Sequence, residues 1–572
     1  MDMMTRIAIL LADTIRTVWP DTEGLPAAEE LRGLLAVPPD PALGDYAFPC
    51  FRLAKPLRSA PPKIAEALCA AWKDGDTASV QPVNGYMNFF LNRANFAAGI
   101  MAELREKQDR FGSSDEGNGK TVCLDYSSIN IAKRFHIGHL SSTMIGHSLK
   151  RIYDFLGYET VGINHLGDWG TQFGKMVCAY KKWGNKEDVE ARGIDAMTEL
   201  YVRFHKEAEK DPALEDEGRA WFKKIEDNDP EAMEIFRWFK EVTLKDAARV
   251  YDILGVSFDS YAGESFYNDK MEPVVQELRD KGLLVESQGA QVVDLSEDNM
   301  PPCLILKSDG TTIYATRDLA AAVYRQNTYR FDKCLYVVAY QQDLHFRQVF
   351  RVLEKMGYPW AKGCVHVSFG MVSFEGEALS TRKGNMILLE DLLSQAVEKA
   401  REIIEEKSPN LENKDEVARQ VGIGAVIYTD LSNNRIKDID FCWDRALNFD
   451  GESGPYVQYT HARCCSVLRK APDFSGATPD WSALTDDEAQ ALLRLISRFP
   501  DVIREAAARY EPSMVTRAVT DIAQAYNKYY YEHRILEGEP AQSAARVALT
   551  DAARTVIKTG LYLIGIEAPE RM

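Results

Sequence analysis

The chain has 572 residues, of which 45% are apolar and 27% are charged, and its formal net charge is −18. This length suits about three to four domains, and an average composition excludes collagen, low-complexity scaffolds and long disordered tails. Every apolar stretch is shorter than the about 18 residues that a membrane-spanning helix needs, and the mean hydropathy is −0.29. We therefore expect a cytoplasmic protein without a membrane partner.

Ten cysteines are scattered along the chain, and none of them forms a Cys-x-x-Cys pair. A zinc cluster of the usual spacing is therefore not expected, and a disulfide framework does not suit so large a chain. We expect buried, reduced thiols, no structural zinc and no metal ligand set.

The first 110 residues mix helical and strand patterns. An amphipathic helix is expected at the N-terminus, a helix over 61–71 begins at two prolines, and 86–91 has the pattern of a strand. The segment 37–45 is rich in Pro and Gly and predicts a loop. A polar stretch at 112–119 marks a boundary, so 1–115 is predicted to be an α+β module.

A strand over 121–126, a helix over about 136–156 and a strand over 159–164 follow one another directly. Strand, helix and strand at this spacing form a right-handed parallel crossover, the beginning of a doubly wound α/β sheet. Further strands are expected at 334–339 and 365–369. The sheet domain is therefore predicted to span 119–400.

A long, charged helical region interrupts that sheet domain. Helical periodicity extends over 185–255, and hairpins are expected within 280–315, so the insertion covers about 180–305. Linking helices are predicted over 401–445 and an all-α bundle over 446–572, with only helices expected from Gly424 onward. The segment 451–572 holds 14 basic and 16 acidic residues, so it repels a polyanion less than the rest of this acidic chain does.

Two histidines lie three residues apart where the first crossover helix begins. His136 and His139 flank Gly138, and Lys133 precedes them. Free N–H groups and the positive end of a helix dipole favour phosphate here, and the imidazoles and the lysine add donors. Such a histidine pair also occurs on ordinary helices or as half of a metal site. The position between strand and helix favours phosphate chemistry.

A second cluster lies in the polar loop Ala378–Gly384, which contains the adjacent cations Arg382 and Lys383. Charged turns are common on protein surfaces, so this loop alone is weak support for a site. Together with the histidine pair it becomes a candidate lid that brings positive charge to a transferring phosphate.

These two clusters resemble the His-Ile-Gly-His and Lys-Met-Ser-Lys-Ser signatures of class I aminoacyl-tRNA synthetases, and in detail the arginyl members of that class. The further motifs that carry the resemblance are Gly44–Tyr46, Ser127–Lys133, Asn164–Gln172, Lys307–Asp318, Gln341–His345, Ser380–Gly384, Gly454–Arg463 and Ala568–Met572. The resemblance implies a Rossmann-like catalytic domain, an N-terminal tRNA-contacting module and a C-terminal α-helical anticodon-binding domain.

The resemblance also implies an activity. L-Arginine is activated with ATP to arginyl-adenylate with release of pyrophosphate, and arginine is then transferred to the 3′ end of tRNA(Arg), giving AMP. The substrate carboxylate is itself the nucleophile, so the protein has to position groups and stabilise phosphate charge. Mg²⁺ is expected to accompany ATP, held mostly by phosphate oxygens and water. By resemblance the protein is a monomer that needs bound tRNA for activation.

Site residues follow from the matching positions. The catalytic residues are expected to be Lys133, His136, His139, Arg382 and Lys383. ATP is expected to contact His136, Ile137, Gly138, His139, His345, Met371, Val372, Ser380, Thr381 and Lys383. Arginine is expected to contact Asp125, Ser128, Asn130, His139, Tyr314, Asp318 and Gln342. The tRNA is expected to contact Tyr46, Tyr456, Gln458, Tyr459, Arg463, Tyr526, Asn527, Arg571 and Met572.

Among these residues, Asp318 is the main candidate for the substrate guanidinium, because a planar five-donor fork is best met by a carboxylate. Tyr314 lies four residues earlier on the same helical face, and Asp125 is a candidate for a second carboxylate. Tyrosines at helical spacing are more often core residues than RNA platforms, so each C-terminal tyrosine has that alternative.

Three departures from the family pattern are present, one of them at two adjacent residues. Ala378 and Leu379 stand where the loop signature has Lys-Met, and Ile129 and Arg134 also differ. In this family a lysine upstream of His-Ile-Gly-His is thought to compensate for the missing loop cation, and here that residue is Lys133.

Three alternatives stay open at this point. The chain could be a tRNA-binding or regulatory paralogue that has lost catalysis, a small class I nucleotidyltransferase such as a relative of pantothenate synthetase, or a synthetase for another amino acid. Retained His136, His139 and Asp318 argue against the first, and the C-terminal bundle argues against the second.

Overall fold

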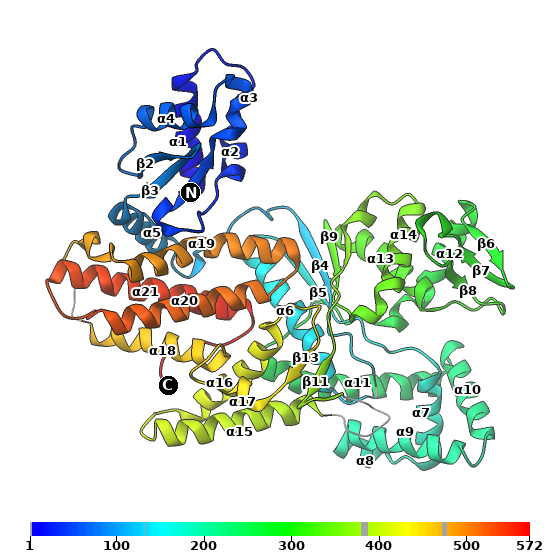
Figure 1. The fold of residues 1–572 in the computed structure, drawn as a ribbon. Coiled ribbons are helices and arrows are strands. Elements are labelled where there is room, and N and C mark those ends of the chain that lie inside the picture. The colour runs from blue at the N-terminus through cyan, green and yellow to red at the C-terminus, as the bar shows by residue number, and fades with distance from the viewer. Residues whose placement is uncertain (1–2, 132, 379–386, 472–476) are drawn as a thin grey trace. The chain divides into compact units, whose positions relative to one another are not determined.

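The computed structural model describes residues 3–131, 133–378, 387–471 and 477–572 (Figure 1). The chain divides into two compact units, and each joins segments that lie far apart in the sequence. Unit 1 comprises Met1–Phe111, Cys464–Phe499 and Gln524–Val556, and unit 2 comprises Gly112–Arg463, Pro500–Ala523 and Ile557–Met572. The predicted region 446–572 contributes to both units, and its domain boundaries stay a prediction.

The N-terminal part of unit 1 packs helices against a three-stranded antiparallel sheet of order β1-β3-β2. Its elements are α1 (Met3–Val18), α2 (Ala28–Leu34), β1 (Tyr46–Pro49), α3 (Ala54–Leu57), α4 (Pro61–Ala71), β2 (Ala78–Val83), β3 (Tyr86–Leu91) and α5 (Arg93–Lys107). Alternate residues of β3, namely Met87, Phe89 and Leu91, are buried as the period of a half-buried strand requires. The predicted N-terminal helix, the helix over 61–71 and the strand over 86–91 are confirmed.

Unit 2 is built on a four-stranded parallel sheet of order β10-β9-β4-β5. The strands are β4 (Thr121–Asp125), β5 (Glu159–Ile163), β9 (Lys333–Tyr336) and β10 (Cys364–His366), and α6 (Leu140–Phe155) packs against β4 and β5. Gly146 allows the close approach, because a Cβ there would collide with Tyr126. The predicted strand–helix–strand crossover is confirmed.

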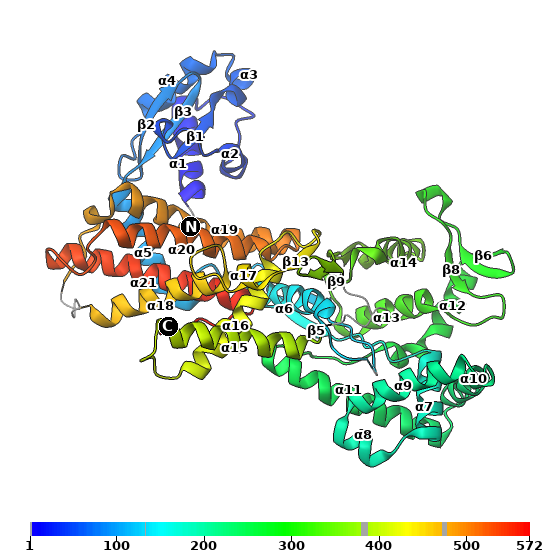
Figure 2. The same cartoon turned by 60° about the horizontal axis from the view of Figure 1, so that its bottom comes forward.

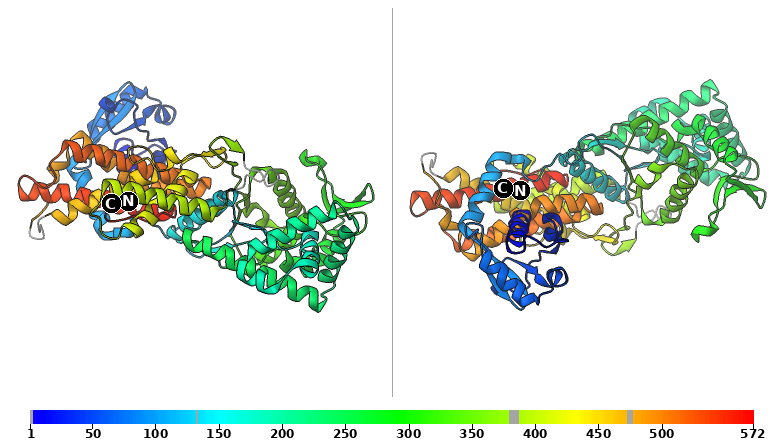
Figure 3. Two further views of the ribbon diagram at one scale, coloured as in Figure 1. Left: turned by 90° about the horizontal axis from the view of Figure 1, so that it is seen from below. Right: turned by 90° about the horizontal axis from the view of Figure 1, so that it is seen from above.

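The insertion after β5 contains five helices that lie beside one another (Figures 2 and 3). They are α7 (Thr171–Trp183), α8 (Lys186–Arg192), α9 (Ile194–Ala208), α10 (Ala213–Glu226) and α11 (Pro230–Leu254). A short helix η5 (Glu264–Lys270) and α12 (Met271–Asp280) then lead to an antiparallel sheet of β6 (Leu284–Ser287), β7 (Ala290–Val293) and β8 (Cys303–Leu306). The predicted helices and hairpins are confirmed.

The chain returns to the main sheet through α13 (Tyr314–Tyr329) and α14 (Asp343–Lys355), which pack against each other. A small third sheet then joins β11 (Val372–Phe374), β12 (Glu377–Ala378) and β13 (Ile439–Phe441). Strand β13 contradicts the expectation of helices alone after Gly424. Its three residues are too few to show a period, and its stability comes from parallel pairing with β11, 67 positions earlier for Val372 and Ile439.

The remaining elements are helical. They are α15 (Leu389–Lys407), α16 (Lys414–Leu431), α17 (Trp443–Ala446), α18 (Gly454–Lys470), α19 (Asp487–Arg509), α20 (Ser513–Glu532) and α21 (Pro540–Leu563). Eight of the ten cysteines are buried. Among the described helices, none combines the length and the apolar character that crossing a lipid bilayer requires.

Candidate functional site

The order in which strands are added to the parallel sheet of unit 2 reverses at β4. The chain passes from β4 through α6 to β5 on one side, and β9 pairs with β4 on the other side. Ligands of doubly wound sheets bind outside the carboxyl ends of the strands at such a switch point. The segment 126–139 follows β4 and the segment 337–345 follows β9, so half of the predicted arginine- and ATP-binding residues lie directly after these two strands.

The turn after β4 is strained. Ser127 and Ser128 both have positive φ values, 69° and 46°, which non-glycine residues rarely adopt. Ser128 donates a hydrogen bond from Oγ to Asp125 Oδ1 over 2.8 Å, and Ser127 contacts the Tyr251 hydroxyl at 2.7 Å. Strain of this kind persists where surrounding contacts fix it, and it is concentrated at functional sites.

The histidine pair forms the entrance to α6. The ring of His136 lies 4.0 Å from that of His139, measured between centroids. Nδ1 of His136 accepts the Gly138 N–H over 3.1 Å, and Nδ1 of His139 accepts the His136 N–H over 3.2 Å. Because both Nδ1 atoms accept, the proton of each neutral ring is assigned to Nε2, which becomes the donor. A Cβ at Gly138 would lie 2.8 Å from the His136 ring, so this position requires glycine.

Both imidazoles are neutral near pH 7. Burial and the nearby charge of Lys133 lower the pKa of His136, and burial with the neighbouring His136 lowers the pKa of His139 to about 3. The Lys133 side chain is exposed, and the Ile137 side chain is fully buried. The pair can therefore offer N–H donors to phosphate oxygens, while Lys133 supplies the positive charge.

The chain directly after the predicted lid is fastened to this entrance. The Ile137 N–H bonds the Ile387 carbonyl over 3.0 Å, and the Leu389 N–H bonds the Phe135 carbonyl over 3.0 Å. Before the lid, β12 ends at Ala378. The predicted lid residues Ser380, Thr381, Arg382 and Lys383 lie outside the described residues. Arg134, which departs from the family pattern, pairs with Asp195 of α9.

Asp318 lies one turn into α13. Its Oδ2 is 2.6 Å from Nε2 of His345, and its Oδ1 is 4.0 Å from Nε2 of His165. Burial disfavours the charged carboxylate, but the His345 contact, together with the charges of His165 and Arg325, lowers the pKa of Asp318. The exposed Tyr314 ring packs 4.9 Å from the His345 ring. Asp318, Tyr314 and His345 are thus brought together as one acidic, aromatic-walled slot.

Asp125 is buried and already paired. Its Oδ2 accepts from Arg325 Nη2 over 2.7 Å, and its other oxygen accepts from Ser128. Arg325 also lies 3.3 Å from Nδ1 of His165, so polar contacts run without interruption from Ser128 to Asp318. The guanidinium of Arg325 therefore already binds the Asp125 carboxylate, which was expected to contact the substrate. This geometry favours a supporting role for Asp125.

Glu264 is an acidic residue that the sequence analysis missed. It begins η5, and burial raises its pKa to about 7, opposed by Arg317 and reinforced by the charges of Asp318 and Asp168. The Arg317 guanidinium is 3.9 Å from its carboxylate. Glu264 belongs to no quoted motif, so only its proximity to Asp318 in space reveals it.

The remaining predicted arginine- and ATP-binding residues lie at separate positions in unit 2. Asn130 bridges to Gly167, and Gln342 is exposed at the end of a short helix, η7 (Tyr340–Gln342). Met371 is exposed, and its N–H bonds Asp438 over 2.7 Å. Val372 begins β11 and is half-buried.

The predicted tRNA-binding residues separate by exposure. Gln458 and Tyr526 are fully buried and Asn527 is nearly so. Gln458 Nε2 bonds the carbonyls of Gln420 and Glu567, which fastens α18 to α16 and the C-terminal tail. The burial of Tyr526 agrees with the core alternative for regularly spaced tyrosines. These three side chains do not face solvent.

The remaining members of that set are accessible to different degrees. Tyr459 is exposed and lies 5.0 Å beneath the Arg463 guanidinium, and Arg571 is exposed near Glu412. Tyr456 is half-buried, as is Tyr46, which pairs with Phe89 in the sheet of unit 1. Met572 packs at the edge of an apolar cluster between α15 and α16.

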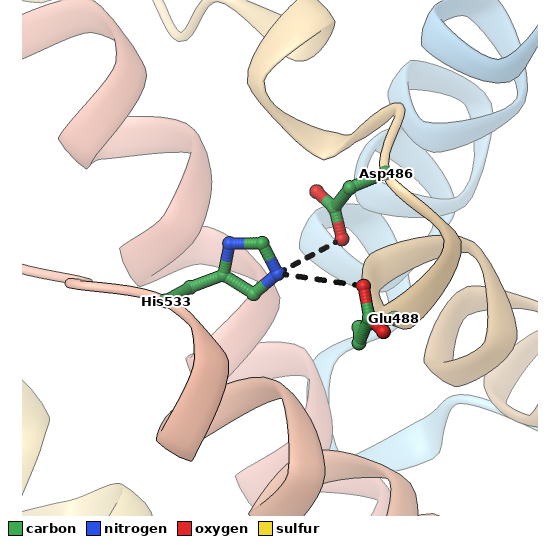
Figure 4. A group of neighbouring side chains, drawn as sticks. All are labelled: Asp486, Glu488 and His533. Atoms are coloured by element: carbon green, nitrogen blue, oxygen red, sulfur yellow. Dashed lines mark ion pairs between the residues drawn. The ribbon is translucent and has the colours of Figure 1, made fainter.

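The residues predicted to bind ATP offer nitrogen donors and hydroxyls, whereas Mg²⁺ prefers oxygen ligands in octahedral geometry. This donor set fits an ion that phosphate oxygens and water hold. A separate group in unit 1, formed by Asp486, Glu488 and His533, has metal-ligand chemistry (Figure 4). His533 Nε2 lies 3.1 Å from Asp486 and 3.8 Å from Glu488.

That group already has internal partners. Asp486 Oδ1 accepts the Ala489 N–H over 2.8 Å at the start of α19, and Lys528 lies 3.3 Å from Glu488. An N-terminal cap and two ion pairs explain the carboxylates without a metal.

Comparisons with known proteins agree with these observations. Residues 101–443 match the family described as "tRNA synthetases class I (R), catalytic domain", 457–572 match "DALR anticodon binding domain", and 5–91 match "Arginyl tRNA synthetase N terminal domain". The chain is 54% identical over 95% of its length to an arginine–tRNA ligase of Alkaliphilus metalliredigens and 52% identical over 95% to that of Halothermothrix orenii, covering 96% of each.

Solved structures give the same result. The arginyl-tRNA synthetase of Thermus thermophilus matches with a TM-score of 0.82 at 25% identity, over 99% of both chains. The fold is also shared with the Plasmodium falciparum arginyl-tRNA synthetase, with a TM-score of 0.79 at 23% identity over 99% of this chain and 98% of that one. The sheet topology, the paired histidines at its switch point and these full-length likenesses show that the chain belongs to the arginyl-tRNA synthetase family of class I.

Proposed function

We propose that this protein is an arginine–tRNA ligase. It activates L-arginine with ATP to arginyl-adenylate, releases pyrophosphate, and transfers the arginyl group to the 3′ end of tRNA(Arg), which leaves AMP. The observation that carries the proposal is the acidic slot at Asp318 in the same unit as the His136–His139 pair: the histidine pair follows β4, and His345, which contacts Asp318, follows the neighbouring strand β9. An acid slot beside a phosphate-binding helix entrance suits a cationic amino acid and a nucleotide.

The guanidinium is proposed to lie between Asp318 and Glu264, with the Tyr314 ring along its face. Two carboxylates suit its fork of donors, and an aromatic face suits its planar charge. The His345 imidazole contacts the Asp318 carboxylate, so the entering guanidinium competes with that imidazole. Ser128 and Asn130 remain candidates for the amino-acid head, whereas Asp125 supports the turn that carries them.

In the first step the arginine carboxylate oxygen bonds to the α-phosphorus of ATP, and the bond from that phosphorus to the bridging oxygen of pyrophosphate breaks. His136 and His139 donate Nε2–H bonds to phosphate oxygens, and Lys133 adds charge where negative charge accumulates. The fastening of Ile387 to Ile137 supports a role for the neighbouring Arg382 and Lys383 at the same phosphates. Mg²⁺ carried by ATP neutralises part of the phosphate charge.

In the second step the terminal ribose hydroxyl of tRNA bonds to the carbonyl carbon of the adenylate, and AMP leaves. Exposed Tyr459 and half-buried Arg463 are proposed to contact RNA, since an aromatic ring with an adjacent guanidinium suits an unstacked base. Tyr456, Arg571 and, on the N-terminal module, Tyr46 are weaker candidates. A monomeric, cytoplasmic enzyme is proposed on family grounds.

The deciding experiment is ATP–pyrophosphate exchange with each of the twenty amino acids, with and without tRNA. We expect exchange with arginine alone, and only when tRNA is present. Exchange with a different amino acid would contradict the proposal and favour a synthetase of other specificity. Binding of tRNA without exchange or charging would favour a paralogue that has lost catalysis.

A further inference from the structure

A fully buried carboxylate in unit 2 has no part in the mechanism described so far. Asp168 follows β5, and its side chain is 0% exposed. Its Oδ2 accepts from Lys240 Nζ over 2.6 Å and from Ser265 Oγ over 2.7 Å, and its Oδ1 accepts the Ser265 N–H over 2.8 Å. A buried charge is costly unless it is paired and hydrogen-bonded. The burial of a charged Asp168 with this complete set of partners therefore calls for a reason.

The backbone that carries this carboxylate fastens two parts of the proposed arginine pocket. The Gly167 N–H bonds the Ile129 carbonyl over 2.9 Å, and the Ile131 N–H bonds the Gly167 carbonyl over 3.2 Å, which holds the loop of Ser128 and Asn130. On the other side the Glu264 N–H bonds the Leu166 carbonyl over 2.9 Å. The loop and Glu264 are therefore aligned through one three-residue segment.

The contact on the Glu264 side is close-packed. A Cβ at Gly263 would lie 2.6 Å from the Leu166 carbonyl oxygen and 2.7 Å from Asp168 Oδ1. Glycine permits this approach, so the Asp168 side chain lies directly against the start of η5, which carries Glu264.

Charge supports the same relation. Glu264, Asp318 and Asp168 repel one another, and this repulsion adds to burial in raising the pKa of Glu264. Lys240, on α11 of the insertion, neutralises Asp168 directly. Asp318 and Glu264, the second of which lies 3.9 Å from Arg317, then remain for one substrate guanidinium.

We propose that Asp168 and Lys240 are positioning residues for arginine: their buried ion pair fixes the segment 166–168, and through it the Ser128–Asn130 loop and Glu264. The helical insertion thereby takes part in amino-acid binding through Lys240. This inference rests on the proposed function and extends it to residues that do not touch substrate.

The test uses the full-length chain with the variants Lys240→Met, Asp168→Asn and the double variant. Arginine and ATP KM and kcat are measured by tRNA-dependent pyrophosphate exchange, and the thermal midpoint by scanning calorimetry. Lys240→Met should raise the arginine KM about 10- to 100-fold, the size expected when a buried charge loses its partner, with the ATP KM within about twofold. The double variant should have a lower arginine KM than Lys240→Met, because no unpaired charge remains.

Matched controls lie on the same helix. Lys245→Met and Asp252→Asn alter exposed residues of α11 and should leave the arginine KM unchanged. Lys240→Arg keeps the positive charge and should therefore retain most of the affinity for arginine that Lys240→Met loses. This variant also tests the ion pair if another variant fails to fold.

Three results would overturn the inference. One is an arginine KM within twofold of the unaltered protein in every variant. Another is an equal rise of the arginine KM and the ATP KM together with a lowered thermal midpoint. The last is an arginine KM of the double variant that equals the combined effects of Lys240→Met and Asp168→Asn. If the unaltered chain has no arginine-dependent exchange, the proposed function itself fails, which this design distinguishes because the unaltered chain is measured first.

Discussion

Two carboxylates of the arginine slot differ in charge before substrate arrives. His345 lowers the pKa of Asp318 despite burial, whereas burial and the neighbouring carboxylates raise the pKa of Glu264 to about 7. Asp318 is therefore ionised near neutral pH, and Glu264 is only partly so. The arrival of a guanidinium favours ionisation of Glu264, so arginine binding and proton release are coupled at this residue.

Arginine binding should depend on pH through Glu264. A raised pKa means that the carboxylate is protonated below about pH 7, so the arginine KM should rise as pH falls from 8 to 6. Glu264→Gln should raise the KM at pH 8 and remove most of this slope. The measurement is pyrophosphate exchange over pH 6–8. The control is Glu272→Gln, a charge change at an exposed residue of α12. An unchanged slope in Glu264→Gln would assign the titration to another group.

Asp318 should decide which amino acid binds. Asp318→Asn should raise the arginine KM about 100-fold or more, because the substrate cation loses its ionised partner in a desolvated slot. The ATP KM should change little. Asp309→Asn, in the exposed turn before α13, is the matched control. If Asp318→Asn leaves the arginine KM unaffected, the slot does not recognise the guanidinium.

The residues of this slot could be predicted only in part. Asp318, Tyr314 and His345 belong to continuous motifs that resemblance identifies. Glu264 lies between motifs, and its role depends on a neighbour 54 positions away in sequence, so nothing local indicates it. The pairing of Asp125 with Arg325 is equally invisible, because it needs the sheet and α13 to be assembled first.

At the scale of elements, one buried contact joins the helix that begins at the histidine pair to α16. Ser141 Oγ donates to Asp430 Oδ1 over 2.5 Å, and the second oxygen of Asp430 has no hydrogen-bond partner among the described residues. Burial raises the pKa of Asp430 to about 7, opposed by the Ser141 bond. Unfolded aspartate has a pKa near 4, so the folded protein binds the extra proton between these values.

Thermal stability should therefore fall as pH rises from about 4 to 7, since ionising Asp430 in place costs free energy. Asp430→Asn should flatten this dependence and raise the thermal midpoint at pH 8, where the buried charge costs on the order of 2–4 kcal/mol, with a smaller gain at pH 5. Asp415→Asn, exposed at the other end of α16, is the control. Calorimetry at both pH values provides the measurement, and an equal shift at both would contradict the assignment.

Elements with a period of their own were predictable, and elements defined by distant partners were not. The β4–α6–β5 crossover has alternating and helical patterns long enough to recognise. Strand β13 has three residues, and its partner β11 lies on the far side of two long helices in the sequence. A short strand of this kind is specified by its partner rather than by its own residues.

At the scale of the whole molecule, exposure separates recognition of RNA from support of the fold. Tyr459 and Gln458 are neighbours on α18, yet the first is exposed and the second is fully buried between carbonyls of α16 and the C-terminal tail. Adjacent substitutions should therefore have different consequences.

Tyr459→Ala should weaken tRNA binding about 5- to 100-fold through loss of stacking, with the thermal midpoint nearly unchanged. Gln458→Ala should instead lower the midpoint, because two buried carbonyls lose their donor. Affinity for tRNA(Arg) and calorimetry are measured on both variants, so each is the control for the other. Equal loss of affinity in both would contradict this division of roles.

Much of the order of helices and strands along the chain was predictable, but the composition of the compact units was not. Residues 1–111 share unit 1 with segments beyond 463, for example where Arg93 pairs with Asp487 over 2.9 Å. Contacts between such remote segments have no local signature, because they are set by surfaces that exist only after each segment has folded.

The interleaving of segments also has a consequence for biosynthesis. Unit 1 has all of its segments only when residues 524–556 have been synthesised, and unit 2 only when 557–572 have been. At about 5–20 residues per second, synthesis from residue 111 to residue 556 takes roughly 20 to 90 seconds. During that interval the nascent N-terminal segment lacks its late partners, and its uncovered apolar surface is open to chaperones.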